Sequence, residues 1–72
     1  MDTKQIEYIL KIAEENNITK AAEKLFITQS ALNQQLLKLE RELGTPLFQR
    51  TKNKWCLTDA GRIYVEGARK MM

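Results

Sequence analysis

Apolar residues recur along most of the chain at intervals of three and four residues, which is the spacing of a helix with one buried face. Near the N-terminus the apolar stripe consists of Ile6, Ile9, Leu10 and Ala13. Asp2 or Thr3 can cap this helix, and Asn16-Asn17 can end it because asparagine tolerates turn conformations. The pattern therefore predicts a first helix over roughly the first fifteen residues of the chain.

A second, shorter helix is predicted from Lys20 to about Leu25. Thr19 can serve as its N-cap, because a threonine hydroxyl accepts a hydrogen bond from the first turn of a helix. The buried side of this helix would carry Ala21 or Ala22. Their small side chains would let another helix approach closely.

The third predicted helix has the clearest pattern in the chain. Its apolar seam consists of Leu32, Leu36, Leu39 and Leu43. Thr28 can cap this helix, Gly44 can end it in a left-handed conformation, and Pro46 prevents it from resuming. We therefore expect a helix from about Gln29 to Leu43, which residues 26–28 separate from the second helix.

The segments 47–50 and 55–57 are short and are predicted to form strands, joined by the polar turn 51–54, where Asn53 can take a positive φ. Thr58 can cap a last helix from Asp59, whose charge complements the helix dipole. The inner stripe of that helix is expected to consist of Ile63, Tyr64, Ala68 and Met71. The chain stops within this helix without a stop signal, so we expect it to be part of a longer protein.

The expected order of elements is helix, helix, helix, hairpin, helix, and the fold class is mainly α. We expect a three-helix core with a short β-hairpin over residues 1–58, and the start of a linker helix over residues 59–72. The close succession of the second and third helices is typical of a helix-turn-helix. With the hairpin as its wing, the predicted architecture is a winged helix-turn-helix.

The inventory of reactive side chains argues against catalysis and metal binding. The chain has 72 residues, a single cysteine and no histidine, so a Cys/His zinc site and the familiar nucleophile–base pairs are excluded. It also lacks a glycine-rich phosphate loop. We expect one small domain that is not an enzyme, binds no cofactor and holds no metal.

No apolar stretch approaches the roughly 20 residues that a membrane helix needs. The N-terminus also lacks a signal-peptide pattern. We therefore expect a cytoplasmic protein that makes no membrane contact.

The distribution of charge is more informative than the net charge of +3. No acidic residue lies between Glu23 and Glu40, and none lies between Glu42 and Asp59. Such acid-free windows favour a face kept clear for an anionic partner such as nucleic acid. The alternative is an ordinary solvated surface on which the acids fall elsewhere by chance.

Neutral hydrogen-bonding side chains gather near the N-terminal end of the third helix, away from its leucine seam. They are Gln29, Ser30, Asn33 and Gln34. Gln and Asn can bond adenine through both N6 and N7 in the major groove, and recognition helices point their N-terminal residues toward base edges. The alternative is a solvated helix face, but such faces more often carry Glu and Lys. We predict that these side chains read bases, and we assign no role to Gln35.

Basic side chains beside this face are candidates for phosphate contacts. They are Lys38, Arg50, Lys52 and Lys54. Each contact would add affinity that depends on salt and not on sequence. The alternative for the hairpin is that charges near its tip only keep it soluble. Trp55 is expected to pack the hairpin against the helices and not to stack on a base, and Cys56 is expected to be structural or incidental and not reactive.

Several segments, all in one register, resemble the LysR-type transcriptional regulators. They are residues 18–32, Leu39-Glu40, residues 42–50 and residues 57–61. The resemblance implies a winged helix-turn-helix that binds double-stranded DNA at partly palindromic sites. It also implies a homodimer joined through the C-terminal helix, and a small-molecule effector that acts only through a following domain missing here.

The resemblance assigns roles to individual positions. Those that correspond to the family's recognition residues are Thr28, Gln29, Ser30, Asn33 and Gln34. Arg50 and the turn Lys52 to Lys54 correspond to the wing, and Thr19 stands where a helix-two hydroxyl often meets a phosphate. We expect phosphate contacts from Thr19 and Thr28 as well as from the basic residues.

The chain departs from the family pattern at several of these positions. Ser30 replaces a common proline, Gln34 a usual arginine, and Leu37 a frequent basic residue. The change at Ser30 should matter little at a helix start, whereas fewer phosphate contacts are expected from the changes at Gln34 and Leu37. The turn Lys52-Asn53-Lys54 replaces a glycine–arginine–glycine type of tip, and lysine suits a narrow minor groove less well than arginine.

Other binding functions remain as alternatives at the level of sequence. A protein-interaction module would use Leu37, Met71 and Met72 as its contact surface. An RNA-binding module would need stacking aromatic residues on an open platform, and most of the few aromatic residues here are needed for the core.

Overall fold

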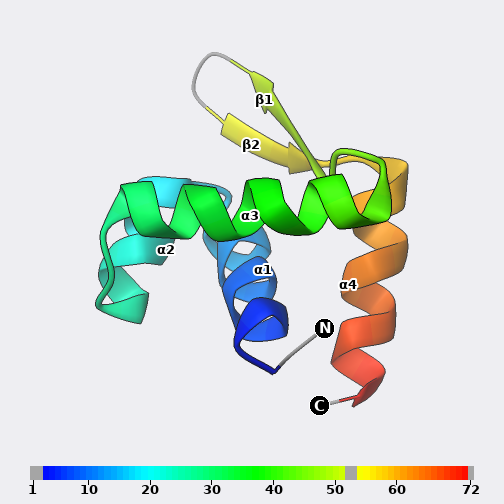
Figure 1. Cartoon of the computed structure of the whole chain (residues 1–72), viewed down its shortest axis with the longest axis horizontal. Coiled ribbons are helices and arrows are strands. Elements are labelled where there is room, and N and C mark those ends of the chain that lie inside the picture. The colour runs from blue at the N-terminus through cyan, green and yellow to red at the C-terminus, as the bar shows by residue number, and fades with distance from the viewer. Residues whose placement is uncertain (1–2, 52–53, 72) are drawn as a thin grey trace.

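The computed structural model describes residues 3–51 and 54–71, which form helices and one β-hairpin (Figure 1). The elements are α1 (Thr3–Glu15), α2 (Ile18–Leu25), α3 (Gln29–Leu43), β1 (Phe48–Thr51), β2 (Lys54–Leu57) and α4 (Asp59–Met71). Figure 1 shows α3 crossing in front of α1, with α2 near its first turns, α4 near its last turns and the hairpin projecting beyond it. The predicted order of elements and the mainly α fold class are confirmed.

The core lies where α1, α2 and α3 pack together. Its buried side chains are Ile9, Ile12, Ile18, Ala21, Ala22, Leu32, Leu36, Leu39, Leu47, Phe48 and Val65. Among them, Leu32, Leu36 and Leu39 belong to the predicted seam of α3, and each is at most 1% exposed. Because this seam faces inward, the opposite side of α3 is left for solvent or a ligand.

The predicted bounds of α3 are confirmed at both ends. The hydroxyl of Thr28 accepts a hydrogen bond from the N–H of Ala31 over 3.0 Å, which caps the first turn. Gly44 has φ 73°, and its N–H donates to the carbonyls of Glu40 and Arg41. A left-handed residue at this position ends the helix and satisfies its last carbonyls.

The predicted cap of α2 is wrong. Asn17, and not Thr19, is the N-cap, because its side-chain oxygen accepts from the N–H of Lys20 over 3.0 Å. The helix therefore begins at Ile18, two positions before the predicted start. Thr19 lies in the first turn, where its hydroxyl is exposed and turned toward α3.

Two positions assigned to buried stripes are also wrong. Leu43 is 43% exposed and Ile63 is 73% exposed, whereas Val65 and Ala68 are buried in α4. Val65 thus takes the place predicted for Ile63, while the predicted Tyr64 and Ala68 do face the core or are buried. The side chain of Met71 lies outside what the structure describes, as do Asp2, Asn53 and Met72.

The hairpin is antiparallel and pairs Phe48 with Leu57 and Arg50 with Trp55. The observed strands are Phe48–Thr51 and Lys54–Leu57, whereas the predicted strands are 47–50 and 55–57. Three of the four ends therefore differ by one residue. The predicted cap of α4 is confirmed, since the hydroxyl of Thr58 accepts from the N–H of Gly61 over 3.0 Å.

None of the helices in the described part of the chain has the length and apolar character to cross a membrane.

Candidate nucleic-acid interface

The uncovered side of α3 carries the polar residues that the sequence singled out. Gln29, Ser30 and Gln34 are exposed, and Asn33 is half-buried beside the hairpin. Each retains polar atoms near the surface because the leucine seam occupies the other side of the helix. The structure thus leaves this set open to a ligand instead of covering it with other side chains.

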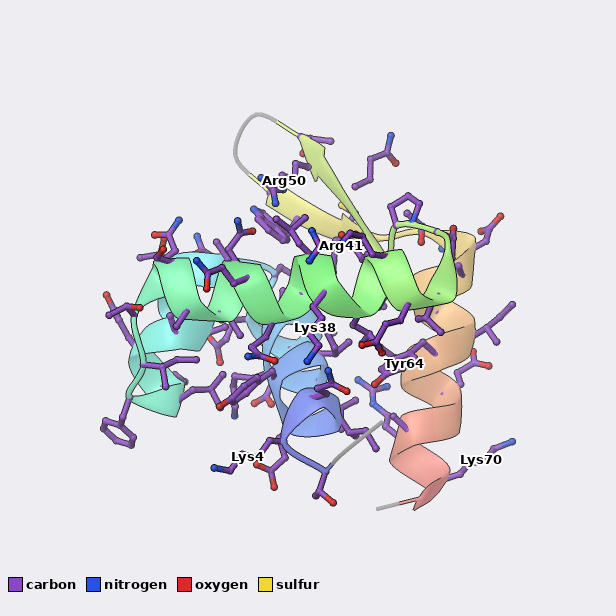
Figure 2. All side chains as sticks on the ribbon, viewed as in Figure 1. Lys4, Lys38, Arg41, Arg50, Tyr64 and Lys70 are labelled. Atoms are coloured by element: carbon purple, nitrogen blue, oxygen red, sulfur yellow. The ribbon has the colours of Figure 1, made fainter. Side chains whose placement is uncertain are left out.

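A basic stripe follows the amide residues along the same exposed side. Gln34, Lys38 and Arg41 line a shallow hollow on α3 together with Gln35 and Leu37. Figure 2 shows Lys38 and Arg41 on this helix. Sequence reasoning did not single out Arg41, although its position seven residues after Gln34 could have placed it on this face.

Thr19 connects α2 to the start of α3. Its Oγ1 donates a hydrogen bond to Oε1 of Gln29 over 2.9 Å, and both side chains are exposed. The contact holds the predicted phosphate ligand and the predicted base-reading amide next to each other. Each still has hydrogen-bonding capacity for a further partner.

Arg50 connects the hairpin to the middle of the reading face. Its Nη2 donates to Oδ1 of Asn33 over 2.9 Å. The guanidinium also lies over the ring of Trp55, with Cζ 4.4 Å from the ring centroid. A cation held over an indole ring in this way is attracted by the electron density of its face.

Trp55 packs the hairpin against the helices, which confirms the structural role predicted for it. It packs against the core, and its ring lies 5.8 Å from that of Phe48 in a tilted arrangement. Its backbone N–H donates to the carbonyl of Asn16 over 3.2 Å, so β2 is also tied to the turn before α2. The ring of Trp55 is thus already in contact with the ring of Phe48 and the guanidinium of Arg50, which fits packing and not base stacking.

A polar hollow of about 460 Å³ lies between the start of α2, the start of α3 and the hairpin. It is lined by Asn17, Ile18, Thr19, Gln29, Arg50, Thr51, Lys54 and Trp55. Arg50 and Lys54 bring positive charge to one wall, and the first turn of α2 brings its positive dipole end to another. The predicted wing residue Lys52 lies outside the described residues.

The ion pairs of the described residues lie away from this surface. Lys11 pairs with Glu14, Lys24 with Glu15, and Arg62 with Asp59. Within residues 3–51 and 54–71, the cations of α3 and the hairpin therefore have no carboxylate partner to neutralise them. Such a surface attracts phosphate groups at a distance and at contact.

Comparison with known proteins finds the same arrangement elsewhere. Residues 3–62 match the protein family described as "Bacterial regulatory helix-turn-helix protein, lysR family". A transcriptional regulator of Bacillus subtilis (strain 168) described as "Uncharacterized HTH-type transcriptional regulator YcgK" is 48% identical over 68 residues. That alignment covers 94% of this chain and 21% of the regulator, so the chain spans about a fifth of that relative.

Solved structures match over nearly the whole chain. The CbnR DNA-binding domain in complex with DNA has a TM-score of 0.92 and 34% sequence identity, covering 99% of this chain and 82% of that domain. The BenM DNA-binding domain bound to the catB site 1 DNA has a TM-score of 0.94 and 35% identity. That match covers 99% of this chain and 79% of the BenM chain.

Proposed function

The chain belongs to the LysR family of bacterial helix-turn-helix regulatory proteins, and from this premise we propose that it binds double-stranded DNA in a sequence-specific manner. Within a longer regulator it would be the DNA-binding domain, formed by residues 1–58, followed by the start of a linker helix in residues 59–72. Its role is to control transcription by binding, and we propose no catalytic activity for it. A cytoplasmic location is part of the same proposal.

The observation that carries this proposal is the uncovered polar side of α3. Ser30 and Gln34 are exposed there, while Leu36 at the back of the same helix is only 1% exposed. A helix with this division of faces fits the major groove, which is about 12 Å wide. The similar CbnR and BenM domains have been solved in complexes with DNA.

In the proposed mechanism, α3 enters the major groove with its N-terminal half toward the base edges. The residues that would read bases are Gln29, Ser30, Asn33 and Gln34. Their amide and hydroxyl groups both donate and accept hydrogen bonds, which is what direct readout of base edges requires.

Phosphate contacts would come from the rim of this face. The proposed ligands are Thr19, Thr28, Lys38, Arg50, Lys52 and Lys54. Arg41 joins them because it lines the same hollow as Gln34 and Lys38. These contacts would fix the position of the domain on the duplex without reading its sequence.

We further propose that the chain acts as a homodimer on a partly palindromic operator, joined through α4. Ile63 on α4 is 73% exposed and lines an apolar hollow with Leu43 and Tyr64. An apolar group left open in this way favours burial against a second copy. A small-molecule effector would act only through a further domain of the longer regulator.

The experiment that tests DNA reading begins with selection of bound sites from a random duplex pool. Gln29→Ala should then weaken binding to the selected site by about 1–3 kcal/mol if Gln29 makes a bidentate base contact. Binding of random duplex should change little, because phosphate contacts dominate it.

Gln49→Ala is the matched control, since Gln49 is an exposed glutamine on β1 outside the reading face. It should leave both affinities unchanged. Base reading by Gln29 is refuted if its alanine variant keeps the wild-type ratio of specific to random affinity.

A further inference from the structure

The contact between Arg50 and Asn33 restricts what Asn33 can offer to a base. Arg50 extends from the hairpin, on the side that faces α3 (Figure 2), and its Nη2 donates to Oδ1 of Asn33 over 2.9 Å. A hydrogen bond from a charged donor is stronger than one between neutral groups. It therefore competes well for the orientation of the Asn33 amide.

The guanidinium is itself held in place by the hairpin. It lies 4.4 Å from the ring centroid of Trp55, and that ring packs 5.8 Å from the ring of Phe48, which is buried. The flat face of the Arg50 guanidinium thus rests on the ring of Trp55, and its Nη2 is bonded to Asn33. A head group fixed in this way reaches Asn33 before any DNA arrives.

Arginine carries donors and no acceptor, so only one orientation of the Asn33 amide satisfies the contact. The oxygen must point toward Arg50, and the amide nitrogen points the other way. The corresponding contact of Gln29 is different, because its partner Thr19 has a hydroxyl that can donate or accept. Gln29 can turn its amide over and keep its bond, whereas Asn33 cannot.

This restriction changes the bases that Asn33 can read. A bidentate contact with adenine needs the amide oxygen and nitrogen to face the base edge together. With its oxygen turned to the hairpin, Asn33 presents N–H donors, and these match the keto oxygens O6 of guanine and O4 of thymine. N7 is an acceptor in guanine and adenine alike, so the discrimination comes from the keto oxygen. The amino groups of adenine and cytosine are themselves donors and would oppose it.

We propose that Arg50 is a positioning residue that makes Asn33 a hydrogen-bond donor, and that Asn33 thereby selects a keto base, guanine or thymine, over adenine or cytosine. The inference rests on the proposed DNA-binding function and specifies it at one position of the operator. It also gives Arg50 a part in base selection beyond the phosphate contact expected of a wing cation.

The test compares base preferences, position by position, among sites selected from a random duplex pool. Asn33→Ala identifies the position that Asn33 reads, because preference is lost there. Arg50→Met removes the donor, and at that same position the preference for a keto base over adenine should fall about tenfold. Arg50→Gln, whose amide can also accept, should give the same change and serves as a second variant if Arg50→Met does not fold.

Lys54→Met is the matched control, since Lys54 is a cation in the same hollow of the hairpin. It should weaken binding to every duplex and leave all preferences unchanged. The proposal is overturned if the Arg50 variants behave like Lys54→Met, or if the wild-type chain prefers adenine at the Asn33 position. A wild-type chain that enriches no sequence at all contradicts the DNA-reading function itself, which is a separate result.

Discussion

At the scale of single residues, the carboxylate of Glu40 directs how the hairpin leaves α3. Its Oε2 accepts from the N–H of Leu47 over 2.6 Å and from that of Phe48 over 3.4 Å. Phe48 begins β1, so this side chain sets the position of the strand that carries Arg50. The precise placement of Arg50 against Asn33 therefore depends on a residue that touches neither of them.

Replacing Glu40 with alanine should lower the free energy of unfolding by about 1–3 kcal/mol, because partly buried N–H donors lose their acceptor. Glu42→Ala is the control, since Glu42 is an exposed glutamate on the same helix. Its effect should stay within about 0.5 kcal/mol. Urea denaturation of both variants measures the difference, and equal stabilities would contradict the role given to Glu40.

At the scale of elements, α4 is attached to the backbone just before the hairpin. The hydroxyl of Thr58 donates to the carbonyl of Pro46 over 2.8 Å, and its N–H donates to the carbonyl of Leu47 over 3.0 Å. Gly61 lies so close to this segment that a Cβ built on it would stand 2.0 Å from the Leu47 carbonyl oxygen. The first turns of α4 and the root of the hairpin therefore hold each other in position.

Gly61→Ala should destabilise the fold by about 1–3 kcal/mol, because the added methyl group overlaps backbone that cannot move aside as a side chain would. Gly67→Ala makes the same change in the same helix, where nothing lies within 4 Å of the new Cβ. It should stabilise the fold by roughly 0.5–1 kcal/mol, since alanine loses less backbone entropy in a helix. Thermal unfolding separates the two, and shifts of the same sign would refute the close approach.

The elements that the sequence predicted well are those with unambiguous end signals. Thr28 caps the first turn of α3, and Gly44 followed by Pro46 ends it. The start of α2 was mistaken because Asn17 and Thr19 are both good caps, and the choice depends on which side chain the tertiary structure recruits. In α4 the apolar period fits either Ile63 or Val65, and only docking against the core buries Val65.

The candidate site was predictable as a set of residue types but not as a set of contacts. The amides of α3 were found from helical spacing alone, which fixes the face they share. The bond between Arg50 and Asn33 joins residues seventeen positions apart, and it depends on the direction of the hairpin. That direction is set by Glu40 and Thr58, whose contacts span a loop that no periodicity describes.

At the scale of the whole molecule, positive charge is distributed unevenly. Ion pairs on α1, between α1 and α2, and on α4 neutralise Lys11, Lys24 and Arg62. The cations on α3 and β2, such as Lys38 and Lys54, have no such partner within the described residues. A duplex approaching the reading face therefore meets cations that no carboxylate of the described residues neutralises.

The position of the cations relative to the reading face predicts which lysines determine the salt dependence of DNA binding. Each phosphate that a cation neutralises releases counterions and adds about 0.9 to the slope of log affinity against log salt. Lys38→Ala should therefore weaken binding to specific and random duplexes alike and reduce the slope by about 1. Lys70→Ala removes the same charge at the far end of α4, away from α3 (Figure 2), and should leave the slope unchanged.

Fluorescence anisotropy titrations across a salt series measure both slopes. Equal reductions in the two variants would mean that net charge, and not a phosphate contact at Lys38, governs the salt dependence.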